Sequence, residues 1–125
     1  MAQIFLTIAA ILGALSVGTG AFGAHALRAQ ISDRTLEIFE TGVRYQMYHA
    51  LALLSVGILL SRAEQIPPTL PFSGFAFIIG IVLFSGSLYA LSLSGVKWLG
   101  AITPLGGAFF IIGWACLAIA TFQYK

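Results

Sequence analysis

Four long stretches without a charged side chain constrain the fold more than any other feature of this sequence. They cover residues 4–27, 45–61, 72–96 and 98–124. A helix needs about 20 apolar residues to cross the hydrocarbon core of a bilayer. Three stretches reach that length outright, and the second reaches it if its helix begins near Gly42, with Arg44 extending toward the headgroups. The pattern predicts four transmembrane helices.

The composition excludes a soluble domain of this size. The chain has 125 residues, of which 59% are hydrophobic and 8% are charged, whereas about a quarter of the residues are charged in an ordinary soluble domain. Because so few charged side chains cannot cover a surface in water, lipid must contact most of it. The formal net charge of +2 is too small for the dense basic face that nucleic-acid binding requires, so no nucleic-acid partner is expected.

The connections between the stretches predict an all-α membrane protein, an antiparallel bundle of four transmembrane helices in one integral membrane domain over residues 1–125. Pro67, Pro68 and Pro71 separate the second helix from the third. Thr103 and Pro104 are suited to begin the fourth helix, with the threonine as its cap. We expect helices over about residues 4–27, 42–61, 72–94 and 103–123.

A short amphipathic segment, residues 33–44, joins the first two predicted spans. Asp33 is placed to cap a helix there, and Glu40 and Arg44 are four residues apart, a favourable spacing for a charge pair. We predict a short helix that lies in the membrane interface and runs into the second span. A soluble amphipathic turn packed over the end of the bundle explains the pattern equally well. The apolar residues of one face recur at helical spacing, namely Leu36, Phe39, Val43 and Met47.

Small residues recur along every predicted span at spacings that let helices approach closely. In lipid, close backbone approach through small residues drives much of helix association, and a repeat of seven keeps one seam facing its partner. We therefore expect a self-contained bundle with the first span nearest its centre. The seams contain Ala9, Gly13, Ser16, Gly20 and Gly23 in the first span, Ala50 and Gly57 in the second, Ser73, Gly80, Ser87 and Ser94 in the third, and Gly106, Gly113 and Ala120 in the fourth.

Polar side chains gather in the leaflet that faces the connections after the first and third spans. Unpartnered polar groups are costly in hydrocarbon, so they should bond one another or line a cavity. They are favoured as polar contacts between helices; the alternative is a pocket for a lipid-like or quinone-like molecule, with Tyr45 and His49 on one helix face. The candidate cluster contains His25, Tyr45, Gln46, His49, Ser85, Ser87 and Tyr89.

Catalysis and cofactor binding have little support in the sequence. The chain has two histidines, one cysteine (Cys116) and no carboxylate deep in a predicted span, so no metal site and no cofactor are expected. An acid, base or nucleophile grouped in a cleft is also missing, so the chain is not expected to be an enzyme. We expect membrane lipids as partners and a function by association, either with a second copy or with a larger membrane complex. Binding of a small molecule is the alternative.

The distribution of basic residues indicates the orientation. Cytoplasmic loops carry an excess of lysine and arginine. The connections after the first and third spans carry more of them than the opposite side, which places both termini outside. The connections after the first and third spans carry Arg28, Arg34, Arg44 and Lys97, and the opposite side carries Arg62 and Lys125.

Five short motifs carry a resemblance that covers essentially the whole chain. They are residues 20–25 (GAFGAH), 45–53 (YQMYHALAL), 84–89 (FSGSLY), 102–107 (ITPLGG) and 113–114 (GW). In this order they resemble the domain-of-unknown-function 423 family, small bacterial inner-membrane proteins related to the transmembrane protein 256 family. The resemblance implies a four-helix protein of the bacterial cell membrane. It implies no reaction, because the family is uncharacterised, but its motifs overlap the polar cluster.

Overall fold

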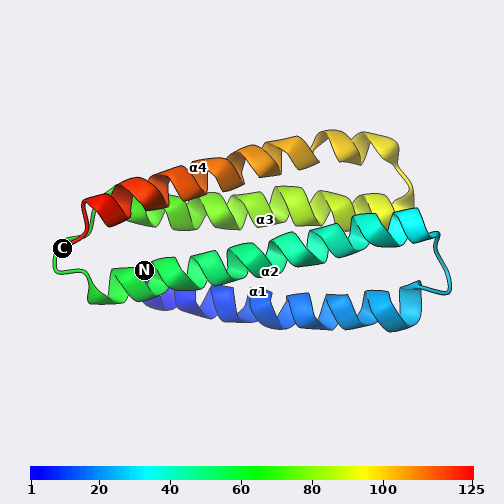
Figure 1. The fold of residues 1–125 in the computed structure, drawn as a ribbon, viewed down its shortest axis with the longest axis horizontal. Helices are drawn as coiled ribbons and strands as arrows, with labels where there is room; N and C mark the ends of the chain where they lie inside the picture. The colour runs from blue at the N-terminus through cyan, green and yellow to red at the C-terminus, as the bar shows by residue number, and fades with distance from the viewer.

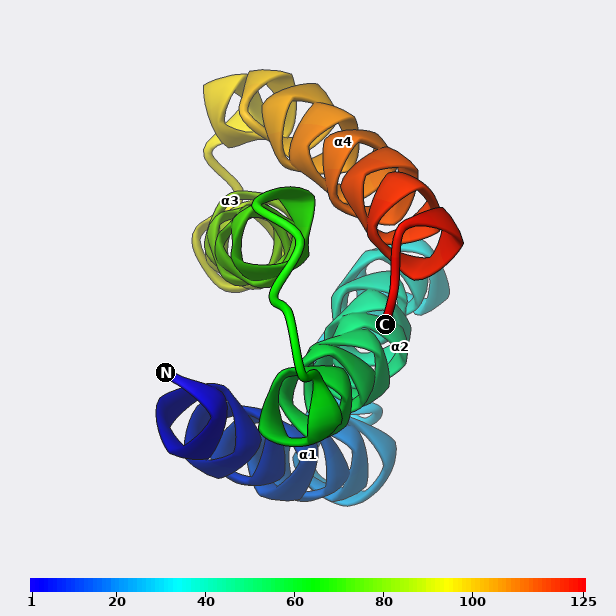
Figure 2. The ribbon, with the colours of Figure 1, turned by 90° about the vertical axis from the view of Figure 1, so that its left-hand side faces the viewer.

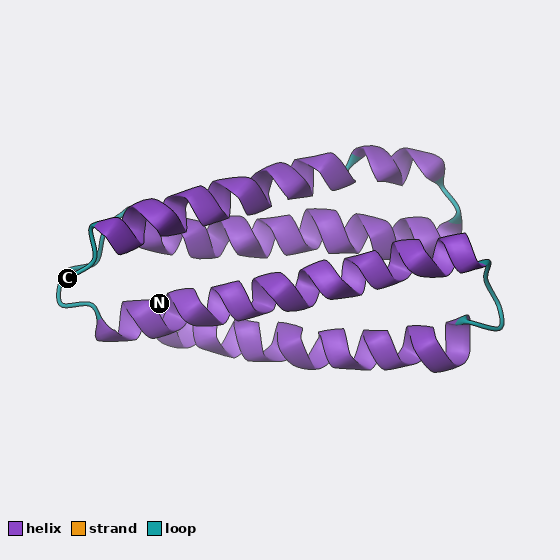
Figure 3. Ribbon diagram, viewed as in Figure 1, coloured by secondary structure: helices purple, strands orange, loops and turns teal.

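The computed structural model describes residues 1–125 and contains only helices and their connections (Figures 1 and 3). Four of the helices are long and apolar enough to cross a membrane, which confirms the predicted all-α bundle of four spans. In chain order the elements are α1 (Ala2–Phe22), the π-helical turn η1 (Gly23–Leu27), α2 (Asp33–Arg62), α3 (Thr69–Ser94), the 3-10 turn η2 (Lys97–Ala101) and α4 (Thr103–Phe122).

Helices that follow each other in the chain lie side by side in space. Helix α1 packs against α2, α2 against α3, and α3 against α4. Both termini lie at one end of the bundle, and the connections after α1 and α3 lie at the other (Figure 1). Figure 2 shows the bundle along its long axis. In this view α1 and α4 lie on opposite sides of the α2–α3 pair.

The first helix is peripheral, so the prediction that it is the most central one is wrong. In the most apolar stretch of each helix, 17% of α1 is buried against 44% of α2 and 44% of α3. Helix α1 packs along α2, and it meets α3 where the ring of Phe5 lies over Gly74 and edge-on against Phe75, 5.2 Å away. Its small residues therefore make one close interface, with α2, instead of two.

Residues 33–44 are helical and run without a break into the second span, as expected, so that they form the first three turns of α2. A helix of 30 residues is ~45 Å long at ~1.5 Å per residue, longer than the ~30 Å hydrocarbon core. The start of α2 therefore extends beyond the core. Leu36 and Phe39 of this segment are buried with Leu27 of η1 and cover the end of the bundle.

The cap of α2 and the expected charge pair differ from the sequence-based predictions. Ser32, not Asp33, caps the helix, because its Oγ accepts the Thr35 amide hydrogen at 3.2 Å. Asp33 instead lies in the first turn, where its charge favours the helix dipole. Arg44 donates to the Thr41 hydroxyl at 3.1 Å instead of to Glu40, and Thr41 is one residue closer to it along the chain.

The start of α4 also uses its threonine differently from the prediction. Pro104 does lie in the first turn, where it loses no hydrogen bond. The helix has no side-chain cap, because the Thr103 hydroxyl is hydrogen-bonded to the Ser87 hydroxyl of α3 at 2.6 Å. The threonine thus joins two helices and leaves the first amides of α4 without a side-chain partner.

Most of the expected small residues lie where two helices touch. A methyl group on Gly106 would collide with the backbone of Phe84, and one on Gly113 would lie 2.7 Å from the Phe77 ring. An added methyl group would also lie close to Phe110 at Gly80, 2.7 Å from Leu6 at Gly57, 3.3 Å from Val43 at Gly20 and 3.0 Å from Phe39 at Gly23. Ser16 is buried, and its hydroxyl donates to the Leu12 carbonyl.

Two residues depart from the expected seams. A methyl group on Gly13 would meet nothing within 4 Å, so this glycine brings no neighbouring helix closer. Ser94 is exposed and its hydroxyl bonds to the Ala90 carbonyl of its own helix, at 2.5 Å. Ser94 lies in the last turn of α3, past the part of the helix that packs against α4. The seven-residue repeat does not show where the contact between α3 and α4 ends.

Candidate functional site

The candidate polar residues are not one cluster in the structure. Gln46, Ser85 and Tyr89 meet where α1, α2 and α3 join. Tyr45 and His49 lie on the other side of α2, facing α4. Ser87 joins α3 to α4 through Thr103, and His25 stands apart from all of these groups.

The first group is a chain of hydrogen bonds that holds three helices together. The Gln46 side-chain amide donates to the Leu12 carbonyl of α1 at 2.9 Å, and its oxygen accepts the Tyr89 hydroxyl of α3 at 2.6 Å. Ser85 donates to the Gly42 carbonyl of α2 at 2.7 Å. Gln46 is 4% exposed and Ser85 is 1% exposed. Because these side chains are hydrogen-bonded to protein atoms, they serve as polar contacts between the helices.

The second group is built around His49 in the middle of α2. Its Nδ1 lies 2.7 Å from the Tyr45 carbonyl oxygen, which can only accept, so Nδ1 carries a hydrogen. Its Nε2 lies 3.1 Å from the indole nitrogen of Trp114 on α4, which can only donate. The two bonds together require a neutral imidazole with one defined tautomer, and they tie α2 to α4.

Aromatic rings fill the space around this bond. The imidazole of His49 stacks on the Phe110 ring of α4, with centroids 3.5 Å apart and planes 6° apart. The Tyr45 ring is nearly parallel to both, at 18° to His49 and 25° to Phe110. Tyr45 also packs against Phe84 of α3, 4.6 Å away, and Phe84 lies 5.3 Å from Phe110. His49 and Phe110 therefore form a stacked pair across α2 and α4, and the nearly parallel Tyr45 ring lies beside that pair.

A groove of about 570 Å³ opens beside this stack, and we call it the aromatic groove. Its outer residues Tyr45, Ile111 and Trp114 are 37%, 73% and 48% exposed, so the groove opens sideways, toward the acyl chains of a bilayer. The lining is apolar apart from a few ring and hydroxyl atoms, as is usual for small-molecule sites. It contains Tyr45, His49, Phe84, Pro104, Gly107, Ala108, Phe110, Ile111 and Trp114.

The polar atoms of the aromatic groove differ in whether they are already hydrogen-bonded within the protein. Both ring nitrogens of His49 and the indole nitrogen of Trp114 are already bonded. The hydroxyl of Tyr45 takes part in none of the side-chain hydrogen bonds of the structure. Because a free hydroxyl in an apolar setting gains most from a partner, Tyr45 is the group that a bound molecule would meet first.

The two histidines do not share a site, in contrast to the expected pairing of His25 with His49. His25 is exposed in η1, after the last α-helical turn of α1, whereas His49 is buried at the centre of α2. Helix α1 lies on the side of α2 away from α4, so its end cannot reach the aromatic groove. The structure also contains no group of three or more histidine, cysteine, aspartate or glutamate residues that could hold a metal ion.

Sequence reasoning missed the α4 side of the groove. The candidate cluster contained no residue of α4, and it left out Phe84, Phe110 and Trp114. Trp114 does pack edge-on against Phe77, 5.2 Å away, but its indole nitrogen is also the partner of His49. The available signal was the Gly113–Trp114 motif: Gly113 packs on Phe77 of α3, and the next residue of a helix points about 100° further around it, away from the face that Gly113 occupies.

Comparison with known proteins gives the family. A family model described as "Protein of unknown function (DUF423)" matches residues 19–107, from the end of α1 into α4. The chain belongs to this family. The match confirms the resemblance seen in the motifs, and it includes Gln46, His49, Ser85 and Tyr89 but not Trp114.

Relatives in this family extend over the whole chain. A UPF0382 membrane protein of Staphylococcus aureus is 48% identical over 122 residues, which are 98% of both chains. UPF0382 membrane protein YwdK of Bacillus subtilis is 47% identical over 122 residues, again 98% of both chains. No solved structure matches. With four membrane-spanning helices and relatives named as membrane proteins, the chain is a small integral membrane protein of a bacterial family of unknown function.

Proposed function

We propose that this protein binds a lipid-like or quinone-like molecule, one with a flat polar head and an apolar tail, in the aromatic groove. The observation that carries the proposal is the ring stack of His49 and Phe110, 3.5 Å apart, beside an unbonded Tyr45 hydroxyl at an opening toward lipid. A flat head can lie against the Tyr45 and Trp114 rings that are exposed at the opening of the groove, because aromatic rings attract each other in offset or edge-on arrangements. The Tyr45 hydroxyl can donate to a carbonyl or hydroxyl of that head.

The groove favours binding without conversion of the ligand. Its imidazole is neutral and both nitrogens are bonded, so it offers no free base. The carboxylates of the chain, Asp33, Glu37, Glu40 and Glu64, lie at or beyond the ends of the spans. We therefore propose a carrier or sensor of the molecule and not an enzyme.

The test is the ligand content of the purified protein in native-lipid nanodiscs. Lipids and quinones extracted from wild type are compared by mass spectrometry with those from Tyr45→Phe, which removes only the hydroxyl. Loss of one hydrogen bond of ~1 kcal/mol lowers occupancy by about fivefold. Tyr48→Phe is the matched control, because Tyr48 is exposed on the same turn of α2 and does not line the groove. Equal ligand content in all three proteins would remove the proposal.

A second function, association with another copy or with a larger membrane complex, is supported by the free side of α1. This helix has one close neighbour, and small exposed residues follow its outer face at spacings of four, four and three: Ala10, Ala14, Gly18 and Ala21. A methyl group on Gly18 would meet nothing within 4 Å. A face of this kind allows another helix to approach closely.

Crosslinking in native membranes tests association. In a Cys116→Ser background, Gly18→Cys is compared with Ile111→Cys, which places the thiol on the exposed side of α4. A short bis-maleimide should give a dimer, or a larger adduct, from Gly18→Cys alone. Monomer from both variants, with no partner copurified, would contradict association through α1.

The orientation is part of the proposal. We place the protein in the bacterial inner membrane with both termini outside, since more arginine and lysine residues lie at the end with η1 and η2 than at the end with the termini. A reporter fused to the C-terminus should be active outside the cytoplasm. Activity inside the cytoplasm would reverse the orientation.

A further inference from the structure

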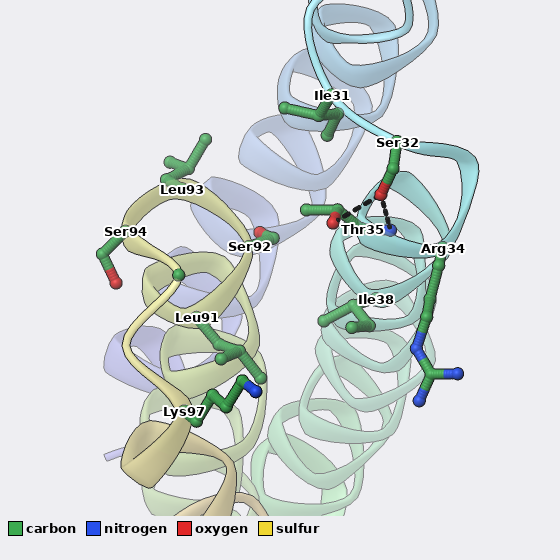
Figure 4. Close-up of a pocket in the computed structure, with 11 residues that line it drawn as sticks. Ile31, Ser32, Arg34, Thr35, Ile38, Leu91, Ser92, Leu93, Ser94 and Lys97 are labelled. Carbon is green, nitrogen blue, oxygen red and sulfur yellow. Dashed lines mark hydrogen bonds between the residues drawn. The ribbon is translucent and has the colours of Figure 1, made fainter.

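A second cavity, of about 850 Å³, lies at the end of the bundle opposite the termini (Figure 4). It separates the start of α2 from the end of α3, and we call it the headgroup cleft. It shares no residue with the aromatic groove. Its lining contains Ile31, Ser32, Arg34, Thr35, Ile38, Leu91, Ser92, Leu93, Ser94, Gly95 and Lys97.

The local sequence builds the α3 side of this cleft. Gly95 has a φ of +73°, a left-handed conformation that glycine adopts without strain, and it ends α3 there. The amide of Val96 then donates to the Ser94 hydroxyl at 3.2 Å, which fixes the turn. Two residues after the glycine, Lys97 returns toward α2, and Figure 4 shows its ammonium group pointing into the space between the two helices.

The charges that line the cleft are all positive. Arg34 and Lys97 are its charged residues, and no carboxylate lines it. In Figure 4 Arg34 extends along the side of α2 away from α3, and its side chain is exposed. Ser32 and Thr35 add two hydroxyl groups, bonded to each other at 2.8 Å. Cations and hydroxyl groups of this kind are phosphate ligands.

From the length of α2 we place the cleft in the polar layer of the bilayer, which carries the phosphates. Helix α2 exceeds the hydrocarbon core by ~15 Å, and the cleft is at the first turn of α2, outside its apolar stretch. Ile31, Ile38, Leu91 and Leu93 line the same cavity. An apolar wall next to two cations matches a molecule that has both a phosphate and acyl chains.

We propose that the headgroup cleft binds a phosphate group, with Lys97 as its charged ligand, Arg34 as a second basic residue of the lining, and the one hydroxyl hydrogen that the bonded Ser32–Thr35 pair leaves free as a hydrogen-bond donor. The phosphate can belong to a phospholipid of the bilayer or be free in solution. The proposal is independent of the aromatic groove, since it concerns other residues at another depth of the membrane.

Phospholipid retention tests the proposal. The protein in nanodiscs of phosphatidylglycerol and phosphatidylethanolamine is released into the gas phase, and the lipids still bound are counted by native mass spectrometry. Lys97→Gln should retain about fivefold less phospholipid, the effect of one basic residue near the membrane surface. Arg28→Gln is the matched control, a basic residue at the same end of the bundle that does not line the cleft. It should retain as much phospholipid as wild type.

A second measurement distinguishes the sources of phosphate. Inorganic phosphate is titrated into the protein in uncharged detergent, and chemical shifts of the Ser32 and Lys97 amides are followed by NMR. Shifts that saturate in wild type and are absent in Lys97→Gln support a site for free phosphate. No shifts, together with a loss of phospholipid in Lys97→Gln alone, support a site for the lipid phosphate. Equal phospholipid retention in wild type and Lys97→Gln with no phosphate shifts, or equal losses in Lys97→Gln and Arg28→Gln, would overturn the proposal.

Discussion

Helix α4 contacts two neighbours in opposite ways. Against α3 it packs backbone to backbone, because Gly106 and Gly113 leave room for Phe84 and Phe77. Against α2 it packs through rings, with Phe110 and Trp114 of α4 in contact with His49. The first interface brings the two backbones close together at its glycines, whereas the second is made by side chains and leaves the aromatic groove open on its outer side.

The contrast teaches where a small membrane bundle can accept a ligand. Close interfaces made by glycine exclude everything but the two helices, so they provide stability. Interfaces made by large rings hold two helices further apart, and polar atoms can be placed in them if each has a partner. Substitutions on the two sides of α4 should therefore differ in effect, with the largest changes at the glycine side.

The largest loss of stability is expected from Gly106→Ala, which tests the close α3–α4 interface. The added methyl group would overlap the backbone of Phe84, which cannot turn away as a side chain can, so the bundle should lose about 2–3 kcal/mol of stability. Unfolding by sodium dodecyl sulfate, followed by circular dichroism, measures it. The control is Gly86→Ala, where a methyl group meets nothing within 4 Å. Equal stability of the two variants would show that α3 and α4 are not in close contact.

A smaller loss is expected from Gln46→Leu, on the side of α2 away from α4. The change removes the bonds to the Leu12 carbonyl and the Tyr89 hydroxyl and should cost about 1–2 kcal/mol. A double-mutant cycle with Tyr89→Phe measures the link between the two side chains in the same unfolding assay. The second substitution should cost less in the Gln46→Leu background. Simple additivity of the two losses would contradict a bond between them.

The smallest effect is expected from Trp114→Phe, which keeps a ring in the aromatic groove and removes the donor to His49. Loss of this bond should lower the stability by about 0.5–1 kcal/mol. Unfolding monitored by circular dichroism measures the change, with Trp98→Phe as the control, because Trp98 is exposed in η2 and does not line the groove. A loss as large as that of Gly106→Ala would mean that the two interfaces of α4 do not differ.

The features that repeat along the chain could be predicted from the sequence. Apolar length gave the four spans, Pro67 and Pro68 gave the break after α2, and the seven-residue spacing found Gly106 and Gly113. These properties depend only on residues within one helix. The sequence also indicated that Gln46 and its polar neighbours belong together, because unpartnered polar groups are costly in a membrane.

Features that depend on how helices rotate against each other could not be predicted. The bond from Trp114 to His49 joins residues 65 positions apart, and helical spacing within α4 does not show which helix a given face will meet. For the same reason the small residues of α1 suggested a central helix, although all of their close contacts lie on α2. Ser32 was missed as the cap because Asp33 is an equally good capping residue by type.

The bond between His49 and Trp114 tests the central claim most directly, since the aromatic groove exists only if these side chains join α2 to α4. Solid-state NMR of the protein in lipid bilayers, with ¹⁵N-labelled histidine and tryptophan, can observe both rings. We predict a neutral His49 with its hydrogen on Nδ1 and a through-space correlation between its Nε2 and the Trp114 indole hydrogen. A hydrogen on Nε2, with no correlation to Trp114, would contradict the account.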